Sequence, residues 1–190
     1  MPDYVRCFIV ATLSRELFEA LAMANPKDDA DLTRLAGRKD LDELELEGRG
    51  VTDKSLAYIS GLSGLRVLSL WRTRITDAGL AHITKLPLKS LVLAHARGIT
   101  DAGLKHLAGL AHLSRLDLWH TPVGDAGLAF VRSLLRLKAL NLAHTQVSDV
   151  GLRHLGGLPR LQELDVRATS VTAVGVAWIQ EHLPRCKVYV

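Results

Sequence analysis

The stretch that decides the fold runs LKALNLAHTQVSDVGLRHLGGL, from Leu137 to Leu158. Its first half alternates apolar and polar residues around Asn141, which is the two-residue period of a β-strand. Its second half places a leucine at every third position from Leu152 onward, which is typical of a short helix with one buried face. We therefore expect a strand, a turn, a short helix and a return segment.

The same unit recurs six times, every 24 residues, from Leu41 onward. The recurrence is clearest where each helix is expected to begin, because Ser148 is a suitable N-cap and Asp149 suits the positive end of a helix dipole. A fixed period of this size indicates a stacked solenoid, since one unit cannot bury its apolar side alone. The equivalent pairs are Thr52-Asp53, Thr76-Asp77, Thr100-Asp101, Gly124-Asp125, Ser148-Asp149 and Thr172-Ala173.

Seven parallel strands follow from this pattern, because each crossover between strands contains a helix. The expected fold is α/β, a right-handed solenoid with the strands on the concave face and the wider helices on the convex face. The inward strand residues are Leu44/Leu46, Leu68/Leu70, Leu91/Leu93, Leu116/Leu118, Leu140/Leu142, Leu164/Val166 and Val188/Val190.

The consensus LxxLxLxxTx(I/V)TDAGLxxL resembles the leucine-rich repeat. It is most similar to the cysteine-containing subtype, which forms the repeat region of many F-box proteins and of bacterial GALA-type effectors. The resemblance covers residues 41–190 and implies a binding solenoid of bacterial source, without naming its partner. Four threonines occupy the place where that subtype often has Cys, and their hydroxyls are expected to bond the turn backbone: Thr73, Thr121, Thr145 and Thr169.

Two units depart from the consensus. The first has Arg49 at the threonine position. The third is one residue short before Leu88 and one residue long after Leu93. The two changes cancel, so the 24-residue spacing of the aspartates is preserved. A bulge is therefore expected near Arg97.

Two regions are predicted from these patterns. Residues 1–40 should form an N-terminal helical cap with a degenerate half repeat, because Asp28-Asp29 lies 24 residues before Thr52-Asp53. Residues 41–190 should form the leucine-rich repeat domain of six repeats and a terminal strand. A helix is expected from Ser14 to Ala24, where Asn25-Pro26 follows.

The amino-acid composition limits the class of protein to which the chain can belong. Hydrophobic residues make up 48% of the chain and aromatic residues only 5%, so the core should be built of Leu and Ala. The net charge of +4 divides into −5 over residues 28–47, with eight acids and three bases, and +9 elsewhere. This asymmetry favours either an acidic partner or plain solubility. Cys7 and Cys186 should not pair across an elongated stack, and we expect a cytoplasmic protein without signal peptide or membrane segment.

The concave face is the predicted binding surface. Its outward positions carry two tryptophans and several polar residues, and Trp and Arg are enriched among binding hot spots. The alternative is that each Trp lies flat over a small neighbour, Ala94 or Ala143, and covers the edge of the concave face. The predicted contact residues are Trp71, Arg72, His95, Asp117, Trp119, His120, Asn141, His144, Asp165 and Arg167.

Three histidines share one ladder position of this face, at His95, His120 and His144. They should span about 10 Å, whereas one zinc ion needs its nitrogens about 2 Å away, so no metal site is expected. A contact surface sensitive to pH is favoured instead. A second ring ladder should pack helix against helix: Tyr58, His82, His106, Phe130, His154 and Trp178.

No catalytic motif is present, and repeat positions explain the recurring Asp and His residues. We predict a non-enzymatic scaffold for an unknown protein partner, with no cofactor, no nucleic acid and no membrane partner. One alternative is a substrate adaptor of a ubiquitin-ligase-like complex of the F-box or GALA type. Another is a structural repeat protein that self-assembles, including a homodimer through the terminal edge strand Val188-Tyr189-Val190.

Overall fold

A computed structural model of the chain describes residues 32, 35, 38–48 and 50–190. The expected N-terminal helix, the half repeat and Cys7 lie almost wholly outside these residues, so the cap stays a prediction. The strands are β1 (Glu43–Glu45), β2 (Val67–Ser69), β3 (Ser90–Val92), β4 (Arg115–Asp117), β5 (Ala139–Asn141), β6 (Glu163–Asp165) and β7 (Lys187–Tyr189). The helices are α4 (Asp53–Ile59), α5 (Asp77–Leu80), α6 (Asp101–Leu104), α7 (Asp125–Val131), α8 (Asp149–Leu152) and α9 (Ala173–His182), with 3₁₀ turns η2 (Ala81–Ile83) and η3 (Lys105–Gly109).

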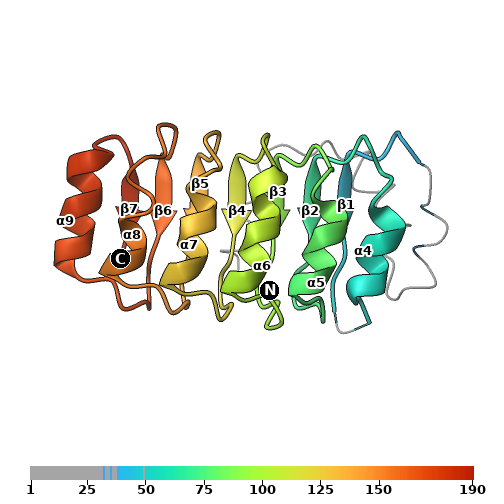
Figure 1. Cartoon of the computed structure of the whole chain (residues 1–190), viewed down its shortest axis with the longest axis horizontal. Coiled ribbons are helices and arrows are strands. Elements are labelled where there is room, and N and C mark those ends of the chain that lie inside the picture. The colour runs from blue at the N-terminus through green and yellow to red at the C-terminus, as the bar shows by residue number, and fades with distance from the viewer. Residues whose placement is uncertain (1–31, 33–34, 36–37, 49) are drawn as a thin grey trace.

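The strands form one sheet in chain order, β1 to β7, and every neighbouring pair is parallel. The predicted leucine columns are confirmed, because Leu116 pairs with Leu91 on one side and Leu140 on the other. Helices α4 to α9 lie in one layer over one side of this sheet (Figure 1). The opposite side, which corresponds to the predicted concave face, is called the strand face below.

The core fills the space between the sheet and the helices. Leu140 and Leu142 from a strand and Leu152, Leu155 and Leu158 from the following segment are all fully buried. Each buried leucine contributes about 1.5–3 kcal/mol relative to an exposed one, so every coil is stabilised mainly by stacking on its neighbours. Cys186 is a free, buried thiol in this core.

The threonine ladder bonds within its own coil. The Thr145 hydroxyl donates to the Leu142 carbonyl at 2.6 Å, and the Thr73 and Thr121 hydroxyls bond the carbonyl three residues earlier in the same way. In the third coil, Ala96 takes this buried position and the extra residue is accommodated at Arg97-Gly98. Gly98 is required there, since an added Cβ would approach the Ile75 carbonyl oxygen to 2.4 Å.

The aspartate at each helix start joins one coil to the next. Asp125 accepts the Ser148 backbone N–H at 2.8 Å and the Ser148 hydroxyl at 2.6 Å. A glycine makes room for it, because a Cβ on Gly151 would lie 2.4 Å from Asp125 Oδ1. The same contact recurs from Asp53, Asp77, Asp101 and Asp149 to Thr76, Thr100, Gly124 and Thr172.

Ala173 ends this aspartate ladder at the last helix. Sequence reasoning assigned the aspartates to the helix dipole alone and missed the bond between coils. These bonds also lower the pKa of Asp149, through the Thr172 backbone N–H first and its hydroxyl second.

Candidate partner-binding surface on the strand face

The predicted histidine ladder occupies a left-handed turn that directly follows each strand. The φ angles are +58° at His95, +54° at His120 and +58° at His144, with Arg72 and Ala168 in the same conformation. Gly48 fills this position in the first coil at +97°. A non-glycine residue is strained in this region, so each turn must be held by its surroundings.

Hydrogen bonds between coils hold these turns. The backbone N–H of His95 donates to the Trp119 carbonyl at 2.9 Å, and that of His120 donates to the Ala143 carbonyl at 3.0 Å. The His144 N–H bonds the Arg167 carbonyl at 2.9 Å. Stacking therefore fixes the backbone from which the three histidines extend, and all three leave the sheet at the same edge.

Five rings meet there and form what is called the aromatic cluster: Trp71, His95, Trp119, His120 and His144. The His95 ring is central, with its centroid 4.4 Å from that of Trp119 and 4.4 Å from that of His120. Trp71 and His144 lie at the two ends, 6.2 Å from His95 and 5.9 Å from His120. Most of these pairs are edge-to-face, the favoured arrangement of aromatic rings.

The two tryptophans differ in exposure. Trp71 is 9% exposed and packs on Val92 and Ala94, so it roofs the strand face as the alternative interpretation expects. Trp119 is half-buried beside it. The Arg72 guanidinium lies 4.8 Å from the Trp71 ring centroid, within cation–π range.

Trp71 carries an unpaired donor. Its Nε1 is buried without a hydrogen-bond partner and is the one such side-chain atom among the described residues. A buried donor left without an acceptor costs about 1–3 kcal/mol. Such a group in a native structure calls for an explanation, and a missing acceptor is one.

Three predicted contact residues serve the fold instead. Asp117, Asn141 and Asp165 are 5%, 6% and 1% exposed, so they do not form the open polar stripe that the sequence suggested. Each accepts the backbone N–H two residues ahead; for Asp117 this donor is Trp119, at 2.8 Å. Arg167 pairs with Asp165, its Nη2 lying 2.5 Å from Oδ2, and stays half-buried. These side chains position the backbone beneath the aromatic cluster.

Burial makes Asp117 an unusual carboxyl group. Loss of hydration, with a smaller contribution from the nearby Asp165 charge, raises its pKa to about 6. The Trp119 backbone N–H and the Asn141 side chain act in the opposite direction and do not overcome burial.

The pKa of His95 is lowered, by burial first and then by His120, Arg72, Arg97 and His144. We therefore expect His95 to lose its proton at a lower pH than an ordinary histidine. A titration of the imidazole carbon-bound protons by NMR measures this directly. An apparent pKa at or above that of a free imidazole would contradict the cluster geometry.

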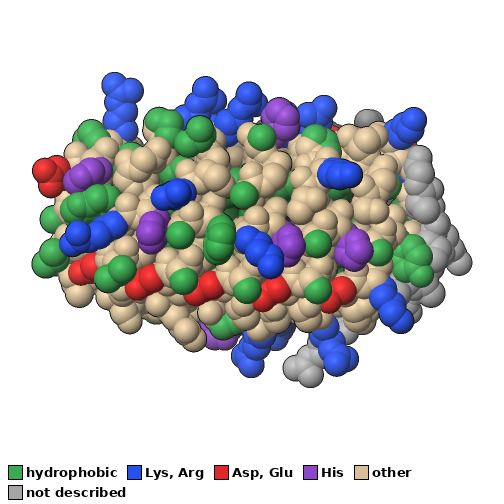
Figure 2. Space-filling model, in the orientation of Figure 1, with side chains coloured by type: hydrophobic (Ala, Val, Ile, Leu, Met, Phe, Trp, Pro, Cys, Tyr) green, Lys and Arg blue, Asp and Glu red, His purple; other side chains and the backbone are tan. Residues whose placement is uncertain are grey.

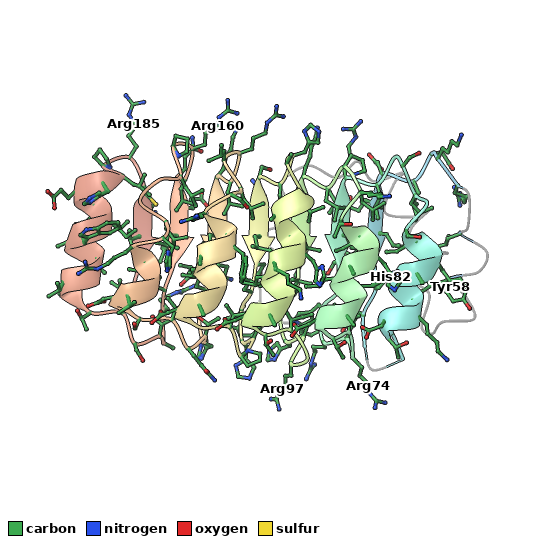
Figure 3. All side chains as sticks on the ribbon, in the orientation of Figure 1. Tyr58, Arg74, His82, Arg97, Arg160 and Arg185 are labelled. Carbon is green, nitrogen blue, oxygen red and sulfur yellow. The ribbon has the colours of Figure 1, made fainter. Side chains whose placement is uncertain are left out.

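The second ring ladder, on the helix side, is partly exposed. Tyr58 and Phe130 are 43% and 39% exposed, and Figure 3 shows Tyr58 and His82 on the same side of the solenoid. Trp178 does pack on the preceding coil, because a Cβ added to Gly156 would lie 2.5 Å from its ring. The helix-packing interpretation therefore holds for Trp178, whereas much of Tyr58 and Phe130 faces solvent.

Two structural findings concern metals and membranes. Within the described part of the chain, no group of three or more His, Cys, Asp or Glu residues is placed to hold a metal ion. Of the helices described, none has both the length and the apolar character needed to span a bilayer.

Comparisons with known proteins agree with this architecture. Residues 85–108 and 137–156 match the family described as Leucine Rich repeat. The fold is a leucine-rich repeat solenoid. A leucine-rich repeat protein of Leptospira interrogans is 22% identical with a TM-score of 0.63, over 85% of this chain and 39% of that one. Internalin C2 of Listeria monocytogenes is 23% identical with a TM-score of 0.56, over 84% of this chain and 72% of that one.

The leucine-rich repeat solenoid thus spans well under half the length of the Leptospira protein. At these identities the likeness concerns the fold. No curated protein is significantly similar to the chain in sequence.

Proposed function

We propose that this leucine-rich repeat solenoid is a non-enzymatic scaffold that binds a protein partner on its strand face, at the aromatic cluster and Arg72. The observation that carries the proposal is the unpaired Trp71 N–H inside a cluster of five rings. A carbonyl or carboxylate of the partner that displaces the covering side chains would satisfy this donor. Trp119, which is half-buried beside it, supplies the apolar contact typical of a hot spot.

The proposal narrows the contact set predicted from sequence. Trp71, Trp119, Arg72 and the three histidines remain candidate contacts, with Arg167 at the margin. Asp117, Asn141 and Asp165 act beneath them as positioning residues, because their oxygens already accept backbone N–H groups. The cysteine-containing, GALA-like subtype and a cytoplasmic location belong to this same proposal.

Replacing Trp119 with alanine is expected to abolish capture of the partner in a pull-down from source lysate. The matched control is Phe130→Ala, which removes a ring that is 39% exposed on the helix side. Both variants must keep the thermal unfolding transition of the parent chain. A partner retained by the parent and by F130A but lost by W119A supports the strand face. Equal capture by the parent, W119A and F130A would mean that the rings only cover the sheet and do not contact the partner.

One observation favours a second candidate, self-assembly. In β7, Val188 and Tyr189 are half-exposed, and this strand is the last one in the sheet. An open strand edge can pair with another chain. Light scattering at high concentration tests this, and a monodisperse monomer would exclude the homodimer. The ubiquitin-ligase adaptor stays a prediction, since the helix it needs lies outside the described residues.

A further inference from the structure

The segments that lead from each helix to the next strand form one edge of the solenoid, here called the return edge. They cover residues 60–66, 84–89, 108–114, 132–138, 156–162 and 183–186. Together these segments contain eight basic residues and no Asp or Glu, and all eight are exposed. The basic residues are Arg66, Lys85, Lys89, Arg132, Arg136, Lys138, Arg160 and Arg185.

Stacking aligns these charges in rows. The backbone N–H of Lys89 donates to the Arg66 carbonyl at 2.7 Å, and that of Gln162 donates to the Lys138 carbonyl at 2.8 Å. Neighbouring strands lie about 4.8 Å apart, so the charges of adjoining coils lie close together. Figure 2 shows the resulting line of Lys and Arg along the upper margin, and Figure 3 shows Arg160 and Arg185 extending away from it.

Arg160 and Arg185 are not neutralised by the fold. Neither forms an ion pair with a carboxylate of the described residues. Arg136 Nη1 instead lies 3.1 Å from Nδ1 of His112, in the preceding coil. Closely spaced like charges repel one another, so the arrangement is unfavourable until an anionic surface covers it.

The return segments themselves contain no acid, and the acids of this edge, Asp40 and Asp42, stand at its start, where the Arg66 N–H donates to the Asp42 carbonyl at 2.7 Å. The aspartates of the ladder stand at the helix starts, on the other half of the helix side, where Figure 2 shows a line of acidic side chains. The other edge also carries basic residues, Arg74 and Arg97 (Figure 3), but the line of aspartates stands beside it. An anionic surface would therefore favour the return edge.

The uncharged residues of the return edge distinguish between anionic partners. Leu135 is 58% exposed, directly before Arg136, and Pro159 and Pro184 are exposed in the next two return segments. These six segments contain no Phe, Tyr or Trp on which a nucleic-acid base could stack. They also present no helix to enter a groove of duplex DNA. A basic row with an exposed leucine at its middle fits a bilayer interface.

We propose that the return edge docks the protein, edge-on, to an anionic lipid bilayer. The basic row contacts the headgroup phosphates, and Leu135 enters the boundary between headgroups and acyl chains. Edge-on docking leaves the strand face free, so this proposal does not depend on the protein partner. It also replaces the expectation of no membrane partner, which considered spanning segments and not an edge assembled from six coils.

The test is co-sedimentation of the full chain with vesicles of phosphatidylcholine, with or without about one third phosphatidylglycerol. We expect binding to the anionic vesicles alone, weakening as salt is raised. Arg160→Ser/Arg185→Ser should weaken it roughly tenfold or more. The matched control is Arg74→Ser/Arg97→Ser, which removes the same charge from the opposite edge (Figure 3) and should bind as the parent does.

The Leu135→Ser variant distinguishes binding to a lipid bilayer from binding to other polyanions. It should weaken vesicle binding several-fold, because an apolar side chain no longer enters the interface. The proposal is overturned if the parent does not bind anionic vesicles, or if the two arginine pairs have equal effects, which would reflect net charge alone. Unchanged vesicle binding by L135S, or tighter binding to duplex DNA or RNA than to vesicles at the same salt, would also overturn it.

Discussion

Replacing Gly151 with alanine is expected to lower the free energy of unfolding by about 2–4 kcal/mol. The new Cβ would lie 2.4 Å from Asp125 Oδ1 and 3.1 Å from Leu128 Cδ1, so the neighbouring coil must shift. Overpacking alone costs about 1–3 kcal/mol. Displacing Asp125 also weakens its two hydrogen bonds to Ser148, each of which involves a charged acceptor. Urea unfolding followed by circular dichroism measures the loss.

A double-mutant cycle tests the cause. Asp125→Ala alone should cost about 1–2 kcal/mol through its lost hydrogen bonds. In that background Gly151→Ala should cost clearly less than it does alone, because the clashing oxygen is gone. The matched control is Gly157→Ala, since a Cβ there meets no atom within 4 Å. Strict additivity of the two changes would show that the glycine and the aspartate act independently.

The stacking architecture was predictable from the sequence because one unit repeats at a fixed period. The alternation around Asn141 and the spacing from Leu152 each specify one element, and repetition then specifies the parallel sheet. Even the irregular third coil was located correctly, at Arg97. The number and register of the strands followed from this period and from the two slips of the third unit, which cancel.

The contacts between coils were harder to predict because they join residues about one period apart. Asp125 and Gly151 each suit a helix start by themselves. An interpretation of each repeat on its own therefore explains both residues and does not reveal the contact between them. The signal was present nonetheless, since four of the ladder aspartates are followed 26 residues later by a glycine of the same DAG or DVG motif. Reading equivalent positions across neighbouring units would have found it.

The sequence predicted which residues of the candidate site lie on the same face, but not how far each of them is buried. Trp71, Trp119 and the histidines lie together, as their ladder positions require. Alternation alone placed Asp117 on the same face as a free hydrogen-bonding group. Its side chain instead accepts a hydrogen bond from the Trp119 backbone N–H. The periodicity of a sequence does not predict which rotamer a side chain adopts.

Asp117→Asn is expected to stabilise the protein at pH 7.5 by about 2–3 kcal/mol. The pKa of Asp117 is raised to about 6 by burial, from an ordinary value of 3.8. Above pH 6 the folded protein must keep a buried, ionised carboxylate, which is costly relative to the hydrated carboxylate of the unfolded chain. An asparagine keeps an oxygen to accept the Trp119 N–H and carries no charge. For a chain of this size the melting temperature should rise by about 4–10 °C.

The sign of the pH dependence is the stricter test. Between about pH 4 and pH 6 the folded state binds a proton at Asp117 that the unfolded state has released, so this group destabilises the fold as pH rises through that window. The advantage of Asp117→Asn over the parent should therefore be full above pH 6 and nearly absent near pH 4. Thermal unfolding of both proteins across this range measures the difference. Asp42→Asn, at an exposed carboxylate, controls for the change in net charge. An advantage that grew toward acid pH would mean that Asp117 is stabilised as the carboxylate, so that its hydrogen bonds outweigh its burial.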